Sequence, residues 1–91
     1  MKTTGEQKRI IPEYTRKISI PEGFRHLLWD HPNGKAPLEK VVHRLLVYAT
    51  FDSIKWLMYH YPEVSYKLIF KYSDIPRGAR FWVKEFYNDK R

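Results

Sequence analysis

The sequence contains no cysteine. This absence excludes disulfides, thiolate metal sites, iron–sulfur clusters and cysteine nucleophiles, and it is typical of a protein from a reducing compartment. Residues 1–9 are polar and do not lead into the apolar stretch of a signal peptide. Nowhere does the chain hold the roughly 18 consecutive apolar residues that cross a membrane. We therefore expect a cytoplasmic protein that has no membrane partner.

Recognisable catalytic chemistry is also sparse. The four glycines are scattered at positions 5, 23, 34 and 78, so they form no phosphate-binding loop. A serine or threonine nucleophile needs a base and a group that orients the base, and the sequence shows no such set. The one close cluster of metal-ligand types, His26, Asp30 and His31, is more typical of polar surface beside a turn. We predict no enzyme, no catalytic residue, no metal and no cofactor.

Acidic residues are outnumbered by basic ones. The chain has 17 Lys and Arg against 10 Asp and Glu, which gives a net charge of +7. This charge favours encounters with nucleic acid, anionic membrane or acidic protein, without selecting one of them. The 91 residues suffice for a single core, and an aromatic content of 16% supplies large side chains for it. The composition therefore predicts one folded domain.

Hydrophobic periodicity predicts an all-α fold, a compact bundle of about five short helices. Prolines at helix starts and turn residues at helix ends place these helices at residues 21–29, 37–49, 51–61, 62–71 and 76–87. Thr50 is the expected N-cap of the third helix. The helical domain is predicted to cover residues 21–88 and to follow a basic arm at residues 1–20.

Two of the predicted helices are clearly amphipathic. In helix 37–49 the inward face is expected to carry Leu38, Val41, Val42, Leu45, Leu46 and Ala49, and the outward face Glu39, Lys40, His43 and Arg44. In the last helix the apolar face is expected to carry Ala79, Trp82, Val83 and Phe86. These patterns separate the predicted core from the predicted surface.

The basic arm has no sustained helical period. Residues 16–20 alternate briefly between polar and apolar side chains, which is typical of a short strand, but the sequence offers this strand nothing to pair with. Two interpretations stay open: a mobile, disordered tail and an extended segment that lies on a partner.

One side of the last helix is a candidate nucleic-acid-binding surface. Arg77, Arg80 and Lys84 are spaced by three and four residues, so they line up along the helix and would suit entry into a major groove. Together with Arg16 and Lys17 of the arm, they are the predicted nucleic-acid-binding residues. The competing interpretation is an ordinary solvated helix face.

Three aromatic residues are candidate contacts for a partner protein. Trp56, Tyr59 and Tyr66 fit the apolar stripes of their helices poorly. Exposed Trp and Tyr are typical of interfaces, because they supply a large contact area at low entropic cost. The alternative is that these residues cover a second side of the core.

Four segments of the chain carry a resemblance to a known family. They are Phe24–Asp30 (FRHLLWD), His43–Ala49 (HRLLVYA), Ile54–Tyr61 (IKWLMYHY) and the pair Phe81-Trp82. In order and spacing, over residues 24–87, they resemble a family of small bacterial helical domains often encoded beside abortive-infection-type nucleotidyltransferase toxins. In that family a capping serine usually precedes the late proline. Here Ile75 precedes Pro76, so Ser73 or Asp74 is expected to cap a slightly earlier helix start.

The resemblance implies an antitoxin-like protein that binds and restrains a nucleotidyltransferase-type toxin, with binding of its own operator DNA left open. The alternative is a small, basic, helix-turn-helix-like transcriptional regulator. A subunit of an enzyme complex is a third interpretation, and homodimerisation stays open in each case.

Overall fold

The computed structural model describes residues 13–89, which form short helices and one two-stranded sheet. In chain order the elements are strand β1 (Lys17–Ser19), the 3₁₀ helix η2 (Glu22–Leu28), strand β2 (Lys35–Pro37) and helices α1 (Leu38–Val47), α2 (Phe51–His60), α3 (Pro62–Lys71) and α4 (Arg77–Asp89). The prediction of a helical bundle is confirmed. Residues 1–12 of the predicted arm lie outside the described residues.

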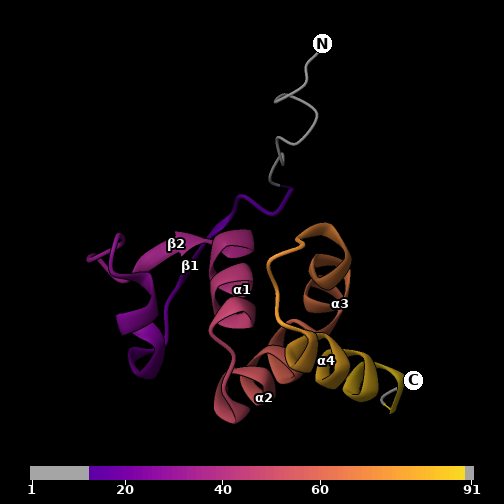
Figure 1. The fold of residues 1–91 in the computed structure, drawn as a ribbon. Coiled ribbons are helices and arrows are strands. Elements are labelled where there is room, and N and C mark those ends of the chain that lie inside the picture. The colour runs from indigo at the N-terminus through magenta and orange to yellow at the C-terminus, as the bar shows by residue number, and fades with distance from the viewer. Residues whose placement is uncertain (1–12, 90–91) are drawn as a thin grey trace.

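Helix α1 occupies the middle of the molecule. The β1–β2 ribbon and η2 lie on one side of it, and α3 and α4 lie on the other (Figure 1). Five of its six predicted inward residues are buried, namely Leu38, Val41, Val42, Leu45 and Leu46, whereas Ala49 lies beyond the end of α1 and is half-buried. The other elements therefore pack around one apolar helix, as its periodicity predicts.

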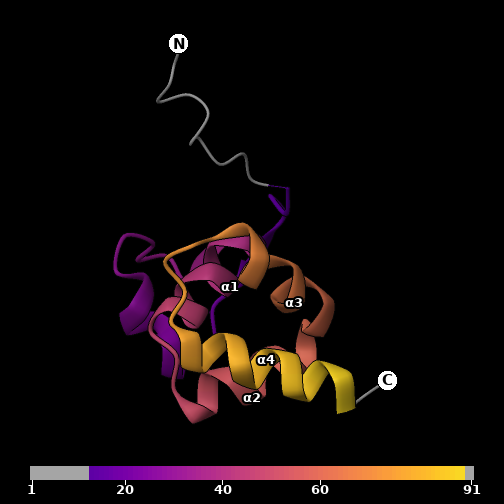
Figure 2. The same cartoon turned by 45° about the vertical axis from the view of Figure 1, so that its right-hand side comes forward.

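Tight corners connect the remaining helices. Thr50 caps α2 as predicted: its hydroxyl accepts the N–H of Ser53, and the Ser53 hydroxyl accepts the N–H of Thr50. Pro62 begins α3, where its missing N–H costs no hydrogen bond. Helix α4 begins at Arg77, so the predicted earlier start is wrong. This last helix packs against both α2 and α3 (Figure 2).

The short strand in the arm has a partner that the sequence did not reveal. β1 pairs antiparallel with β2, with Lys17 opposite Pro37 and Ser19 opposite Lys35. Gly34 makes this pairing reachable, because it adopts a φ of 80° directly before β2. Only glycine takes that backbone conformation without strain. The expectation that the strand has nothing to pair with is therefore wrong.

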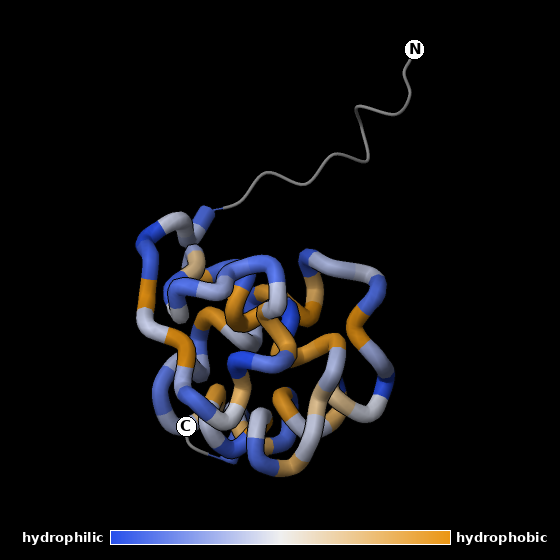
Figure 3. Tube along the Cα trace, turned by 90° about the vertical axis from the view of Figure 1, so that its left-hand side faces the viewer, coloured by the Kyte–Doolittle hydropathy of each residue, from blue (hydrophilic) through white to orange (hydrophobic). Residues whose placement is uncertain are grey.

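Two side chains, Glu39 and Trp82, differ in burial from what hydrophobic periodicity predicts. Glu39 was expected on the outward face of its helix, yet only 2% of it is exposed, because the arm and the end of α3 cover it. Trp82 was expected in the core, yet it is 48% exposed, because Ala79 and Val83 fill the contact of α4 with the bundle. Hydrophobic and hydrophilic segments otherwise alternate along the trace (Figure 3). No described helix combines the length and the apolar character needed to cross a bilayer.

Candidate functional site

One apolar surface feature lies where the α1–α2 corner meets the start of α4. It is a hollow of about 620 Å³. Its lining is Val47, Tyr48, Ala49, Thr50, Phe51, Ile54, Pro76, Gly78, Ala79, Trp82 and Phe86. None of these side chains is charged. We call this feature the corner hollow.

The corner hollow is open because of how the local chain turns. The Thr50 cap ends the corner and directs α2 away from α1, which leaves Tyr48 and Phe51 at the rim. Phe51 is 66% exposed and Tyr48 is 49% exposed. From the other side, Trp82 stacks on Phe86 with ring centroids 5.6 Å apart. Large aromatic side chains thus surround the hollow without closing it.

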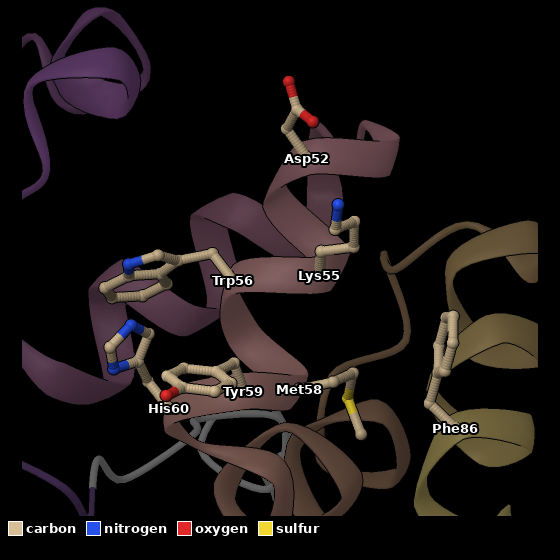
Figure 4. Close-up of a pocket in the computed structure, with 7 residues that line it drawn as sticks. All are labelled: Asp52, Lys55, Trp56, Met58, Tyr59, His60 and Phe86. Atoms are coloured by element: carbon tan, nitrogen blue, oxygen red, sulfur yellow. The ribbon is translucent and has the colours of Figure 1, made fainter.

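A second hollow, of about 460 Å³, continues along α2. Figure 4 shows its lining side chains, which are Asp52, Lys55, Trp56, Met58, Tyr59 and His60 from α2 and Phe86 from α4. Phe86 lines both hollows. We refer to the two hollows together as the α2–α4 groove. Along α4 this groove extends from Pro76 to Phe86, about 15 Å at the rise of an α-helix.

The predicted partner-binding residues divide between this groove and another surface. Trp56 and Tyr59 line the groove; Tyr59 is 78% exposed, whereas Trp56 is half-buried and packs near Phe24. Tyr66 lies on α3 outside the groove and stacks on Tyr87 at 4.2 Å. The structure therefore brings two of the three predicted residues to one surface.

Sequence reasoning missed the residues around the corner hollow, Tyr48, Phe51 and Trp82. Tyr48 and Phe51 flank a predicted tight corner, and large apolar residues on both sides of a corner are hard for one core to cover. That pattern was a usable signal. The exposure of Trp82 carried no such signal, because Trp82 fits the apolar stripe of its helix.

The predicted nucleic-acid-binding residues are not gathered into one patch. Arg77 and Lys84 are exposed on α4, and the Lys84 ammonium lies 5.3 Å from the Phe70 ring centroid on α3. Arg80 is half-buried and donates hydrogen bonds to backbone carbonyls, from Nε to Ile75 (2.9 Å) and from Nη2 to Tyr72 (3.0 Å). Its guanidinium therefore holds the α3–α4 loop in place.

Arg16 and Lys17, the other two predicted nucleic-acid contacts, lie at the opposite side of the molecule from α4. Lys17 begins β1, and the carbonyl of Arg16 accepts the N–H of Leu38 at the start of α1. Both side chains are exposed. They face a different surface from Arg77 and Lys84, because α1 separates the ribbon from α4 (Figure 1).

A buried carboxylate organises the other end of α1. Glu39 Oε1 accepts the backbone N–H groups of Glu13 (2.7 Å) and Tyr14 (3.2 Å). Its Oε2 accepts the Tyr72 hydroxyl (2.5 Å) and the Lys71 ammonium (2.7 Å). We refer to these residues as the Glu39 cluster. A single side chain thereby joins the arm, α1 and the end of α3.

The ionisation of this cluster follows from its contacts. Burial disfavours the Glu39 carboxylate, but the hydrogen bonds from Lys71, Tyr72 and the arm outweigh it and lower the pKa of Glu39 to about 2. Burial, followed by the neighbouring Glu39 charge, raises the pKa of the Tyr72 hydroxyl above its ordinary range. At neutral pH the pair is therefore a carboxylate and a neutral phenol, a structural contact with no proton ready for transfer.

Two further polar contacts fasten the surface of α1. His43 Nε2 lies 2.9 Å from Asp74 Oδ1, and the His43 ring stacks on Tyr72 at 3.9 Å. Asp30 lies 2.6 Å from the Lys40 ammonium and 3.3 Å from Arg44. These two cations hold the pKa of Asp30 well below its usual range. Both contacts join α1 to loops, and Lys40 and His43 also line a small hollow of about 320 Å³ beside Glu39 and Tyr72.

His26, Asp30 and His31, the cluster weighed as a metal site, are only partly brought together, with His31 Nε2 lying 3.8 Å from Asp30 Oδ2. Asp30 is engaged by Lys40 and Arg44. Within residues 13–89, no group of three or more His, Asp or Glu side chains is placed to hold a metal ion.

No protein-family model matches the chain, and comparison with curated proteins and with solved structures finds no match. The candidate site is therefore defined by its own geometry. That site is the α2–α4 groove.

Proposed function

We propose that this chain is an antitoxin-like binding protein that uses the α2–α4 groove to hold and restrain a nucleotidyltransferase-type toxin. The observation that carries the binding role is the corner hollow, where Tyr48, Phe51 and Trp82 are each about half exposed or more around a lining free of charge. Monomeric proteins seldom leave a cluster of large apolar side chains in water unless a partner covers it.

The chemistry of the groove favours a protein partner. Tryptophan and tyrosine at the centre of an apolar patch are the residue types that contribute most to protein–protein affinity. A groove about 15 Å long matches roughly three turns of a helix with apolar anchors on one face. The nature of the partner, a nucleotidyltransferase-type toxin, comes from the family that residues 24–87 resemble.

DNA recognition by α4, the alternative function, has weaker support. It needs cations that are free to reach base edges and phosphates. Arg80, the central member of the predicted set, is bonded to the carbonyls of Tyr72 and Ile75. Only Arg77 and Lys84 remain exposed on that helix for such contacts.

The test is co-purification with the product of the adjacent gene where that gene encodes a nucleotidyltransferase, followed by titration of the two purified proteins. Trp82→Ala and Phe51→Ala are expected to weaken the complex about 30-fold or more, the effect of a central hot spot. Phe70→Ala is the matched control. Phe70 is 61% exposed on α3 and does not line the groove, and its loss is expected to change affinity less than about threefold.

The outcomes separate the two parts of the proposal. A complex that Trp82→Ala leaves unchanged would disprove the groove as the binding surface. Failure of the nucleotidyltransferase to bind or to be inhibited would disprove the antitoxin role. Apolar contact also predicts that the affinity changes little between low and high salt, whereas DNA binding through α4 would weaken steeply.

A further inference from the structure

We propose that the β1–β2 ribbon and the residues beside it bind the phosphate backbone of a nucleic-acid duplex. The ribbon lies on the other side of α1 from α4 (Figure 1). This site is independent of the proposed toxin binding. It keeps Arg16 and Lys17 of the predicted nucleic-acid-binding residues and leaves out those on α4.

The pairing register places two lysines on one face of the ribbon. Lys17 is opposite Pro37, and Lys35 is opposite Ser19. Directly opposed residues share a face, as do residues two apart on one strand, so Lys17 and Lys35 are diagonal neighbours on the same face. Both are exposed, whereas Ala36 on the other face is fully buried. The diagonal separation in such a pair is on the order of 7–8 Å.

Two arginines extend this charge at the edges of the ribbon. Arg16 directly precedes β1 and is exposed, and the alternation along the strand places it on the opposite face from Lys17. Arg25 of η2 donates from Nε to the carbonyl of Ile20 (3.4 Å) at the end of β1. A Cβ at Gly34 would lie only 3.0 Å from the Arg25 Nη2, so the guanidinium rests directly on the turn before Lys35. Four permanent cations thus lie on or beside the six residues of the ribbon. We call Arg16, Lys17, Arg25 and Lys35 the ribbon patch.

The ribbon patch is not neutralised within the described part of the chain. None of its four cations forms an ion pair with another residue between 13 and 89. The acidic residues nearest in sequence are Glu13, Glu22, Asp30 and Glu39. Asp30 pairs with Lys40 and Arg44, and Glu39 pairs with Lys71, which leaves the exposed Glu13 and Glu22 beside four cations. An anion would therefore gain from contact with the patch.

The side chains around the patch favour a nucleic acid over a lipid bilayer. Membrane-surface binding by a basic segment relies on apolar side chains that enter the acyl region. The exposed residues of β1 and β2 are Lys17, Ser19 and Lys35, and the exposed residues of η2 are Glu22, Gly23, Arg25 and His26. None of these is a large apolar residue. Trp29, directly after η2, is 64% exposed, and its ring lies 4.6 Å from the Arg44 guanidinium. Backbone phosphates need only charge and hydrogen-bond donors, which these side chains supply.

The proposal is tested with the full chain and a mixed-sequence DNA duplex of about 20 base pairs, followed by fluorescence anisotropy over 50–200 mM salt. Each lost phosphate contact lowers the slope of log K against log salt by about 0.9. Lys17→Gln with Lys35→Gln is therefore expected to lower the slope by about 2 and to weaken binding at least tenfold at 50 mM salt.

Arg77→Gln with Lys84→Gln is the matched control on α4 and is expected to leave the slope unchanged. A second duplex of scrambled sequence is expected to bind equally well, since phosphates carry no sequence information.

Several results would overturn the proposal. A lower salt slope in the variant with Arg77→Gln and Lys84→Gln would assign DNA binding to α4, if the variant with Lys17→Gln and Lys35→Gln kept its slope. Tighter binding to vesicles containing phosphatidylserine than to the duplex would make the patch a membrane contact. No binding at 50 mM salt would exclude the phosphate site outright. All four substitutions are at exposed residues, and circular dichroism of each variant checks the fold.

Discussion

The two ends of α1 differ in how the chain covers them. At the N-terminal end, the Glu39 carboxylate is 2% exposed, and donors from the arm, Lys71 and Tyr72 satisfy both of its oxygens. At the C-terminal end, Tyr48 and Phe51 stand half exposed or more beside an apolar hollow. One end buries a polar group that prefers water, and the other exposes apolar groups that avoid it.

This difference indicates which end is complete within one chain. A buried carboxylate is tolerated only when its hydrogen-bonding capacity is met, so the Glu39 cluster has no remaining need for a partner. The exposed aromatic rings, in contrast, are not covered by the rest of the chain, and each would bury roughly 150–250 Å² in a full contact with a partner. We therefore assign structure to the closed end and binding to the open end. The predictions below test that division.

The largest effect is expected from Glu39→Ala at the closed end. Removing the carboxylate leaves the Lys71 ammonium and the Tyr72 hydroxyl without their shared acceptor and frees the arm. Breaking a buried ion pair in this way costs about 3–5 kcal/mol. Urea denaturation measures the change. Glu85→Ala, at an exposed site on α4, is the control, with an expected change within about 0.5 kcal/mol. A loss near 1 kcal/mol in Glu39→Ala would show that the cluster is not the main support of that end.

The same carboxylate predicts how stability depends on pH. The pKa of Glu39 is lowered from 4.5 to about 2 in the folded chain. A lowered folded-state pKa gives stability that is fully present above pH 4.5 and is lost as pH falls toward 2, about 3 kcal/mol in all. Thermal melts between pH 7 and pH 2 measure this loss. Glu39→Gln is expected to remove most of the fall, and Asp30→Asn only the part that comes from the lowered pKa of Asp30. An equally steep fall in Glu39→Gln would contradict the assignment.

The sequence predicted the helices well, because each helix carries its own signals. The period of Leu38, Val41 and Leu45, the Thr50 cap and the Pro62 start are all local patterns. The β1–β2 pairing was missed, because a three-residue strand has no recognisable partner in sequence. Its partner is known only once the 3₁₀ helix η2 turns the chain back.

The burial of individual side chains and the position of the candidate site were harder to predict than the helices, because both depend on contacts between distant segments. The hydrogen-bond partners that bury Glu39 lie 25 to 33 residues away, so no local pattern marks it as buried. Trp82 lies on an apolar stripe, but only the placement of α2 decides how much of that stripe is covered. Tyr59 was found as a surface aromatic because it departs from the period of its own helix. Long-range packing, in contrast, decides which apolar residues stay exposed to solvent.

A smaller effect on stability is expected from Arg80 of α4, whose side chain holds the α3–α4 loop. Arg80→Ala removes two charge-assisted hydrogen bonds, to the carbonyls of Tyr72 and Ile75. The expected destabilisation is about 2 kcal/mol. Arg77→Ala, three residues earlier on the exposed side, is expected to change stability by less than about 0.5 kcal/mol. Urea denaturation compares the two variants. Equal stabilities would mean that Arg80 is a surface cation after all and would restore it as a nucleic-acid contact.

The smallest effect is expected at the cap of the open end. Thr50→Ala removes one hydrogen bond of the capping box at the start of α2 and is expected to cost about 1 kcal/mol, measured by thermal and urea unfolding. Thr50→Ser keeps the hydroxyl and should restore most of that loss. The corner is held by this local contact and by the Ser53 hydroxyl, which also reaches the carbonyl of Leu45 at 3.3 Å. Among residues 13–89, no hydrogen-bond network comparable to the Glu39 cluster supports it. A loss of 3 kcal/mol or more, on the scale of a broken buried ion pair, would mean that the open end is as tightly built as the closed one. The exposed aromatics would then need an explanation other than an end left open for a partner.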